Sequence, residues 1–254
     1  MLEGTSSIGG YCGNTLRRYN DFVNLSEGKP RDRSRLNTSI RQLPPHADFL
    51  AVAYRVVPAG RVPEGMEVLT TEKRRALIRD PAALARAFLA VSPRHFDDGE
   101  AALQYVLSGE SELLTSPAIE SAESLSASPP LSDDDRIEFV DFGPNCVVLE
   151  VHSLAPRILV LNEMFCKNWT ATIDDKDTPI FPANYLFRGV VVPAGASTVV
   201  FEYRSTAFTI GLWVTIASGV LLLAVVLMCR PTRRPGPNDD RSRPVPIRSQ
   251  RQID

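Results

Sequence analysis

The chain has 254 residues, a formal net charge of −2 and 44% hydrophobic residues. These values fit a folded protein of one large domain or two small ones. The balance of charge gives no indication of nucleic acid or of acidic partners. The 20 prolines gather outside the apolar runs.

The region from residue 1 to residue 130 gives the weakest structural signals. The segment from Lys29 to Arg41 is charged and lacks an apolar period, so we expect an exposed loop. Propensity alone favours a helix from Glu72 to Leu89. Pro81 would remove a backbone donor and clash with the preceding turn, so we expect no continuous helix there.

A helix is better supported between Asp97 and Leu107. Acidic residues open this segment, where they interact favourably with the helix dipole. Apolar residues follow at helical spacing (Ala102, Leu103 and Val106). A linker rich in Ser, Pro and Asp, from Ser121 to Asp135, then marks the expected boundary between regions 1–130 and 131–206.

Short apolar runs alternate with turn residues between Arg136 and Tyr203. From Ile137 to Phe142, apolar and acidic side chains alternate with a period of two, which is typical of a strand with one solvent-facing side. Gly-Pro-Asn, Asp-Asp-Lys and Pro-Ala-Gly turns separate the runs. The pattern predicts an antiparallel β-sandwich of about six strands, over residues 136–142, 146–152, 157–163, 169–174, 185–192 and 198–203.

The segment from Ala207 to Cys229 contains no charged residue and would form a helix about 34 Å long, enough to cross a bilayer. A buried core helix is the alternative, but such helices rarely run this long without a polar face. Within about 20 residues of the span, only Arg188 and Arg204 lie before it, whereas six arginines follow it. The positive-inside rule therefore places the tail in the cytoplasm and residues 1–206 outside.

The N-terminus shows no basic and apolar signal peptide that could start translocation of residues 1–206. We therefore expect earlier membrane spans, in a missing N-terminal half or in a split partner. The tail, 230–254, is rich in Pro and Arg and too polar to build a core, so we expect it to be disordered.

The segments after Arg157 follow an order that is typical of one protein family. Residues 159–180 read LVLNEMFCKNWTATIDDKDTPI, and PANYLFR, VPAG and VFEYR follow at 182–188, 192–195 and 200–204. This order resembles the C-terminal end of the bacterial YfhO family of membrane proteins, in which a final transmembrane helix also follows at once. Asn168 and Asp175 replace two turn glycines of the family, and Asn and Asp are the residues that best tolerate positive φ.

A looser resemblance extends upstream, at Gly9–Tyr11 with Arg18-Tyr19 and at a short strand over Ala53–Val56. Around Asp80-Pro81 it implies two strands, Arg75–Arg79 and Ala85–Val91. The family is similar to GT-C glycosyltransferases, which use a polyprenyl-phosphate-linked sugar as donor. In that class the catalytic acid lies in an early extracytoplasmic loop, which has no counterpart here. The resemblance therefore implies that this chain is not itself catalytic.

No group of residues in the chain predicts catalysis, a metal or a cofactor. The histidines are scattered without ligand spacing, and Cys-x-x-Cys and nucleophile-elbow motifs are absent (His46, His95 and His152). Asp133–Asp135 and Asp174–Asp177 could each be imagined as a cation site, but a solvated linker and a turn explain them better. Cys146 and Cys166 could form a disulfide across a hairpin near Pro156, or remain free thiols.

Trp169, Tyr185 and Arg188 are the candidate ligand contacts. Aromatic faces stack on sugar rings, and a planar guanidinium binds phosphate or carboxylate. The alternative is structural, with Trp169 as a core residue and Arg188 as an ion-paired strand residue.

The sequence thus predicts an α+β protein with an extracytoplasmic mixed α/β region (1–130), an antiparallel β-sandwich (131–206), one transmembrane helix (207–229) and a cytoplasmic tail (230–254). The expected function is support of glycosyl transfer to cell-envelope polymers or lipids. The alternative is a stand-alone, membrane-tethered module that binds a glycan or a protein. The expected partners are the lipid bilayer, a multi-span membrane protein and a glycan or polyprenyl-phosphate sugar.

Overall fold

The computed structural model describes residues 17–31, 50–81, 83, 85–108, 112–121 and 127–229. The predictions for the loop after Arg31, for Gly9–Tyr11 and for the tail lie outside these residues. The chain divides into two units, one that ends at Arg204 and one that begins at Ser205. The first unit combines sheets and helices and the second holds one apolar helix, so the predicted α+β fold class is confirmed.

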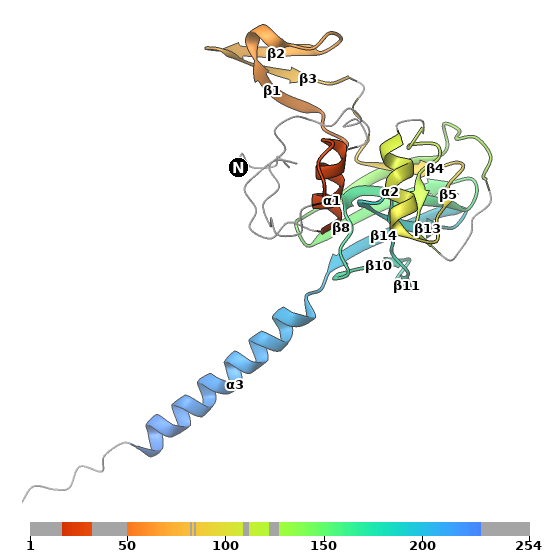
Figure 1. Ribbon diagram of the computed structural model, residues 1–254. Coiled ribbons are helices and arrows are strands. Elements are labelled where there is room, and N and C mark those ends of the chain that lie inside the picture. The colour runs from red at the N-terminus through yellow and green to blue at the C-terminus, as the bar shows by residue number, and fades with distance from the viewer. Residues whose placement is uncertain are drawn as a thin grey trace, which may run out of the picture. The chain divides into compact units, whose positions relative to one another are not determined.

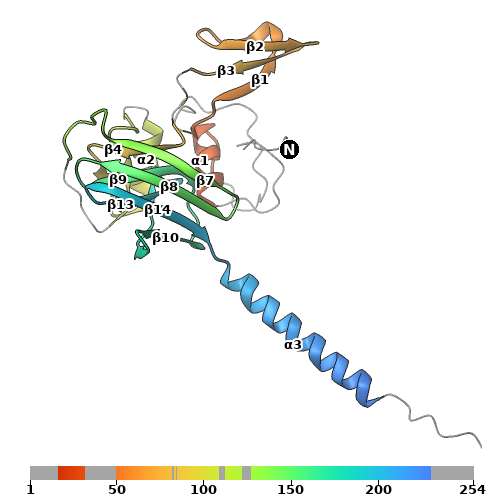
Figure 2. The ribbon, with the colours of Figure 1, turned by 180° about the vertical axis from the view of Figure 1, so that it is seen from behind.

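Two β-sheets form the body of the first unit (Figures 1 and 2). The five-stranded sheet has the order β11-β10-β14-β8-β7, with β7 (Arg136–Phe142), β8 (Cys146–Ser153), β10 (Trp169–Ile173), β11 (Lys176–Thr178) and β14 (Gly195–Tyr203). The six-stranded sheet has the order β4-β9-β13-β12-β6-β5, with β4 (Ala87–Ala90), β5 (Arg94–His95), β6 (Ala118–Ile119), β9 (Arg157–Met164), β12 (Phe181–Ala183) and β13 (Phe187–Val192). Neighbours are antiparallel except for β5 and β6, which pair in parallel.

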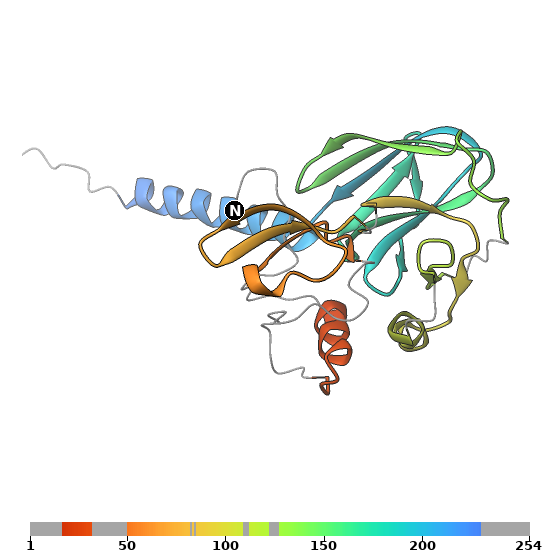
Figure 3. The same ribbon diagram turned by 90° about the horizontal axis from the view of Figure 1, so that it is seen from above.

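The six-stranded sheet is buried on both faces. Leu159 and Leu161 of β9 pack in the core shared with the five-stranded sheet. Ile158 and Val160, which alternate with them, belong to a second core that also contains residues of two helices. These helices, α1 (Arg17–Ser26) and α2 (Gly99–Ser108), lie on the opposite side of the sheet from the five-stranded sheet (Figure 3). The sequence of a strand buried on both faces is typically a continuous apolar run, and β9 has such a run from Ile158 to Leu161.

The helix predicted from Asp97 to Leu107 is confirmed as α2. The Asp98 carboxylate accepts a hydrogen bond from the backbone N–H of Ala101 at 2.8 Å and so caps the helix. The predicted apolar stripe is fully buried (Ala102, Leu103 and Val106). Helix α1 was not predicted, because in its largely polar sequence, RRYNDFVNLS, three buried apolar residues lie among charged and amide ones (Tyr19, Phe22 and Val23).

All six strands predicted between residues 136 and 203 are present, and β11 and β12 are two short strands that were not predicted. The linker before them does not separate two sheets: β4 pairs with β9, with Phe88 opposite Val160. Strands from both sides of residue 130 therefore share the six-stranded sheet.

A smaller antiparallel sheet has the order β1-β3-β2, with β1 (Tyr54–Pro58), β2 (Glu67–Glu72) and β3 (Arg75–Arg79), and a 3₁₀ turn, η2 (Ala59–Arg61), follows β1. The strand predicted over Arg75–Arg79 is confirmed as β3. Its predicted successor is present as β4, but in the six-stranded sheet.

The two glycine replacements have different structural consequences. Asp174 and Asp175 adopt φ values of 50° and 64° in a two-residue hairpin that pairs Ile173 with Lys176. Two positive φ angles are typical of a type I′ turn, so the expectation for Asp175 is confirmed. The turn at Asn168 is also present, with the backbone N–H of Trp169 donating to the carbonyl of Cys166 at 3.1 Å, although Asn168 itself does not adopt a positive φ. Its side-chain amide instead donates to the Tyr203 hydroxyl at 3.1 Å.

Gly189 on β13 lies opposite Phe181 on β12, and a Cβ at this position would lie 2.5 Å from the Phe181 ring. We expect Gly189→Ala to lower the free energy of unfolding by about 1–3 kcal/mol, because overpacking forces neighbours to shift. Denaturant unfolding of the full chain in detergent micelles measures this. Gly60→Ala is the control, because a methyl group added there would have no atom of the described chain within 4 Å beyond its immediate neighbours. Equal losses in both variants would contradict the prediction.

The second unit contains α3 (Thr206–Met228), whose most apolar stretch of 18 residues has a mean hydropathy of 2.5. The Ser205 hydroxyl accepts a hydrogen bond from the backbone N–H of Phe208 at 3.2 Å and caps the helix. No residue of α3 is buried. Among the described residues, α3 is the one helix long and apolar enough to cross a membrane, and it coincides with the predicted span.

Candidate functional site

The structure brings together Trp169 and Arg188, two of the three candidate ligand contacts. The Arg188 guanidinium, from β13, lies 3.6 Å from the centre of the Trp169 ring, at the start of β10. Tyr203 packs against the indole in an edge-on arrangement with 5.5 Å between ring centres. The Arg188 guanidinium therefore covers one face of Trp169, and the two side chains form a cation–π pair.

Arg188 is deeply buried, with 3% of its surface exposed. Its Nε donates to the backbone carbonyl of Met164 at 3.1 Å, and its Nη1 has no hydrogen-bond partner among the described residues. Burial lowers the pKa of Arg188 to about 10, although the charge of Glu163 opposes this shift. The guanidinium is thus still charged at neutral pH, in a place where charge is poorly solvated.

Tyr185, the third candidate, lies in a different cluster. It has a φ of 63° and is buried, and the Arg18 guanidinium lies 4.7 Å from the centre of its ring. Burial raises the pKa of the Tyr185 hydroxyl, and the charge of Asp21 adds to the shift. The neighbouring Asn184 side chain bonds to the backbone of Ala118 and so ties this turn to β6. Tyr185 therefore packs with Arg18 and is not part of the Trp169–Arg188 pair.

Arg18 joins α1 to this cluster through a two-pronged ion pair. Its two Nη atoms lie 2.6 and 2.7 Å from the two carboxylate oxygens of Glu120, and Nη1 also donates to the Tyr185 carbonyl at 2.9 Å. Parallel hydrogen bonds between guanidinium and carboxylate are among the strongest side-chain contacts. This contact fastens α1 to the end of β6.

We expect Glu120→Gln to lower the free energy of unfolding by about 1.5–3 kcal/mol, because it weakens two hydrogen bonds between charged groups. Denaturant unfolding followed by circular dichroism measures the loss. Glu67→Gln is the control: Glu67 lies 3.6 Å from Arg79, and both side chains are more than half exposed, so its loss should stay below about 1 kcal/mol. Equal losses would show that the Arg18 contact is not stabilising.

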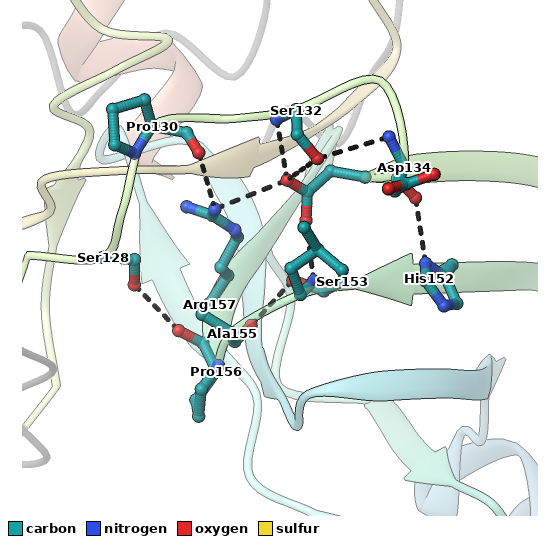
Figure 4. A network of polar contacts seen from close by, with 11 residues as sticks. Ser128, Pro130, Ser132, Asp134, His152, Ser153, Ala155, Pro156 and Arg157 are labelled. Atoms are coloured by element: carbon teal, nitrogen blue, oxygen red, sulfur yellow. Dashed lines mark hydrogen bonds and ion pairs between the residues drawn. The ribbon is translucent and has the colours of Figure 1, made fainter.

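A second polar network occupies the region where the linker enters β7 (Figure 4). Arg157 and Asp135 form an ion pair at 3.4 Å, and each side chain is only 1% exposed. Backbone N–H groups of Ser132 and Leu154 each donate to the Asp135 carboxylate at 2.9 Å. Arg157 also donates to the carbonyl of Pro130 at 3.3 Å. The interpretation of Asp135 as part of a solvated linker is therefore wrong, because its carboxylate is buried and paired.

Further contacts of the same network fix the linker on both sides of this ion pair. The Ser128 hydroxyl donates to the carbonyl of Pro156 at 2.8 Å, and a ring nitrogen of His152 lies 2.9 Å from the carbonyl oxygen of Asp134. Figure 4 shows these residues around the turn between β8 and β9. The end of the linker is thus an ordered part of the first unit.

A shallow hollow of about 200 Å³ lies over β7, β8 and β14 of the five-stranded sheet. Its rim includes Glu138 and Glu150, which are directly opposite each other on β7 and β8, together with Arg136 and Asp174. Among the described residues, no group of three or more His, Cys, Asp or Glu side chains could hold a metal ion.

The two cysteines considered for a disulfide are free, as is Cys229. Cys146 begins β8 in the five-stranded sheet, whereas Cys166 follows β9 of the six-stranded sheet. Strands β8 and β9 do not pair with each other, so the hairpin that would have brought the thiols together is absent from the described part of the chain.

The described structure thus defines a β-sandwich protein with two helices on one sheet and, in a second unit, one apolar helix of membrane-spanning length. No protein-family model, curated protein or solved structure matches the chain.

Proposed function

We propose that the chain is a non-catalytic, membrane-anchored domain that supports glycosyl transfer to cell-envelope polymers or lipids, together with a multi-span membrane partner. The order of β9 to β14, followed after Arg204-Ser205 by α3, is the observation that carries this proposal. It is the order on which the resemblance to the YfhO family rests. The roles of Asn184 and Asp175 in turns give physical reasons for two of the shared motifs.

In this proposal the first unit lies outside the cytoplasm and the arginine-rich tail lies inside. The excess of arginine after α3 supports this orientation. An impermeant maleimide applied to intact cells should label a cysteine introduced at the exposed Glu138, on a background without the four native cysteines. It should not label a cysteine introduced at Arg233. The reverse labelling pattern would refute the orientation.

The supporting role is tested by comparing membranes with and without the full chain. We expect transfer of sugar from a polyprenyl-phosphate donor to fall when the chain is absent and to return when it is restored. We also expect a multi-span protein to co-purify with the chain in mild detergent. Unchanged transfer in membranes that lack the chain would contradict the proposal.

A second candidate function is a stand-alone, membrane-tethered binding module. The observation that favours it is that Trp169, Tyr203 and Arg188 meet within this one chain. The DNA that flanks the coding sequence distinguishes the two candidates. An adjacent frame with many apolar spans favours the supporting role, and unrelated neighbours favour the stand-alone module.

A further inference from the structure

Two buried arginines lie between the sheets of the sandwich, one at each end of the β9–β13 pair. Arg157 opens β9 opposite Val192, and Arg188 on β13 lies opposite Leu161. The alternation of each strand points both side chains to the same side as Leu159, in the core between the sheets. A buried charge is costly unless it is paired with an opposite charge.

Arg157 has such a partner in Asp135, but Arg188 has none among the described residues. The carboxylate that acts on Arg188 through space is Glu163, and Glu163 pairs with Arg86 at 3.6 Å. Arg188 is left with one backbone acceptor and the face of Trp169. Its positive charge is therefore uncompensated by any hydrogen-bonded carboxylate of the described chain.

The residues around the Arg188 guanidinium are partly open to solvent. Met164 and Trp169, the two residues that contact the guanidinium directly, are both partly exposed. Met164 is unbranched and adapts its conformation readily. Because Arg188 itself is only 3% exposed, binding of a small ligand at its guanidinium requires a local movement of these two side chains.

We propose that Arg188, oriented by Trp169, binds an oxyanion, either a phosphate or a carboxylate group of a ligand. The guanidinium edge presents parallel N–H donors that match two oxygens of such a group, and stacking on the indole holds that edge in one plane. A bound oxyanion supplies both the missing charge and an acceptor for Nη1. The inference rests on the proposed binding role but not on the multi-span partner, which the test leaves out.

The test uses the full chain in nanodiscs of neutral phosphatidylcholine. We expect sodium phosphate to stabilise the fold against denaturant beyond sodium chloride at equal ionic strength. At a phosphate concentration about ten times its Kd, the unfolding equilibrium constant should fall about tenfold. Arg188→Gln should abolish this effect. Arg136→Gln, which removes an exposed arginine from the other side of the five-stranded sheet, should retain it.

Equal stabilisation by phosphate and chloride, or a full phosphate effect in Arg188→Gln, would overturn the proposal. If Arg188→Gln does not fold, the Trp213→Phe variant provides a second measurement, because it leaves Trp169 as the sole tryptophan. Phosphate should then change the Trp169 fluorescence in a saturable way, and an unchanged signal would overturn the proposal.

A further comparison identifies the source of the oxyanion. Nanodiscs that contain phosphatidylglycerol, without added phosphate, should stabilise the wild type but not Arg188→Gln if a lipid headgroup is the ligand. Stabilisation by free phosphate alone would indicate a soluble ligand with the same chemistry. If glycosyl transfer does not depend on the chain, the results with phosphate and with phosphatidylglycerol still stand. The two proposals therefore fail independently of each other.

Discussion

Replacing Asp135 by alanine is expected to lower the free energy of unfolding by about 3–5 kcal/mol, because it leaves the charge of Arg157 buried without a partner. The measurement is denaturant unfolding of the full chain in detergent micelles. Asp133→Ala is the matched control: Asp133 is exposed, and its loss should stay within about 0.5 kcal/mol. Removing both partners, in Asp135→Ala with Arg157→Met, should recover most of the stability. Similar losses for Asp133 and Asp135 would contradict the prediction.

The same ion pair should make the free energy of unfolding decrease at acid pH. Burial by itself raises the pKa of Asp135, but hydrogen bonds from Ser132 and Leu154 and the charge of Arg157 outweigh burial, so the pKa is lowered. A carboxylate whose pKa is lowered on folding stabilises the fold above its unfolded pKa, about 3.9. This contribution is lost as the pH falls from about 4 through the folded pKa. The acid loss should be smaller in Asp135→Asn than in the wild type.

Placing arginines at both Ile216 and Val220 is expected to abolish integration of α3 into a membrane. The two charges lie four residues apart on one helix face and cost about 5–7 kcal/mol together near the helix centre. This cost matches the gain from the twelve Phe, Ile, Leu and Val residues of α3, about 4–7 kcal/mol. Carbonate extraction of membranes should release the double variant and retain Ile216→Leu/Val220→Leu. Retention of the arginine variant would show that α3 is not held by the bilayer in this way.

The apolar patterns predicted α2 and six of the strands after residue 135, because core-facing residues repeat with the period of their element. They predicted α3 because its sequence is long, apolar and uncharged. Helix α1 escaped prediction because only three of its apolar residues are buried and, apart from the partly buried Leu25, the rest of its sequence is polar. The pairing of β4 with β9 also escaped it, since no local pattern specifies which distant strand lies alongside.

The candidate site was predicted in part. Trp169 and Arg188 were singled out for their chemistry, but their contact depends on two strands in different sheets. No local pattern in a single sequence specifies a contact between residues of two different sheets. The Asp135–Arg157 pair was missed for a related reason: three consecutive aspartates resemble a solvated segment, and only the fold distinguishes the buried one.

The six-stranded sheet also limits when the chain can fold during its synthesis. Strands β4, β5 and β6 are synthesised before β9, β12 and β13, the strands that complete their sheet. The sheet cannot close until Val192 has been made, 14 positions before α3 begins at Thr206. At about 5–20 residues per second, roughly one to three seconds separate these events. The apolar faces of the early strands therefore need shelter while about 100 further residues are made, and their sheet is completed shortly before α3 is synthesised.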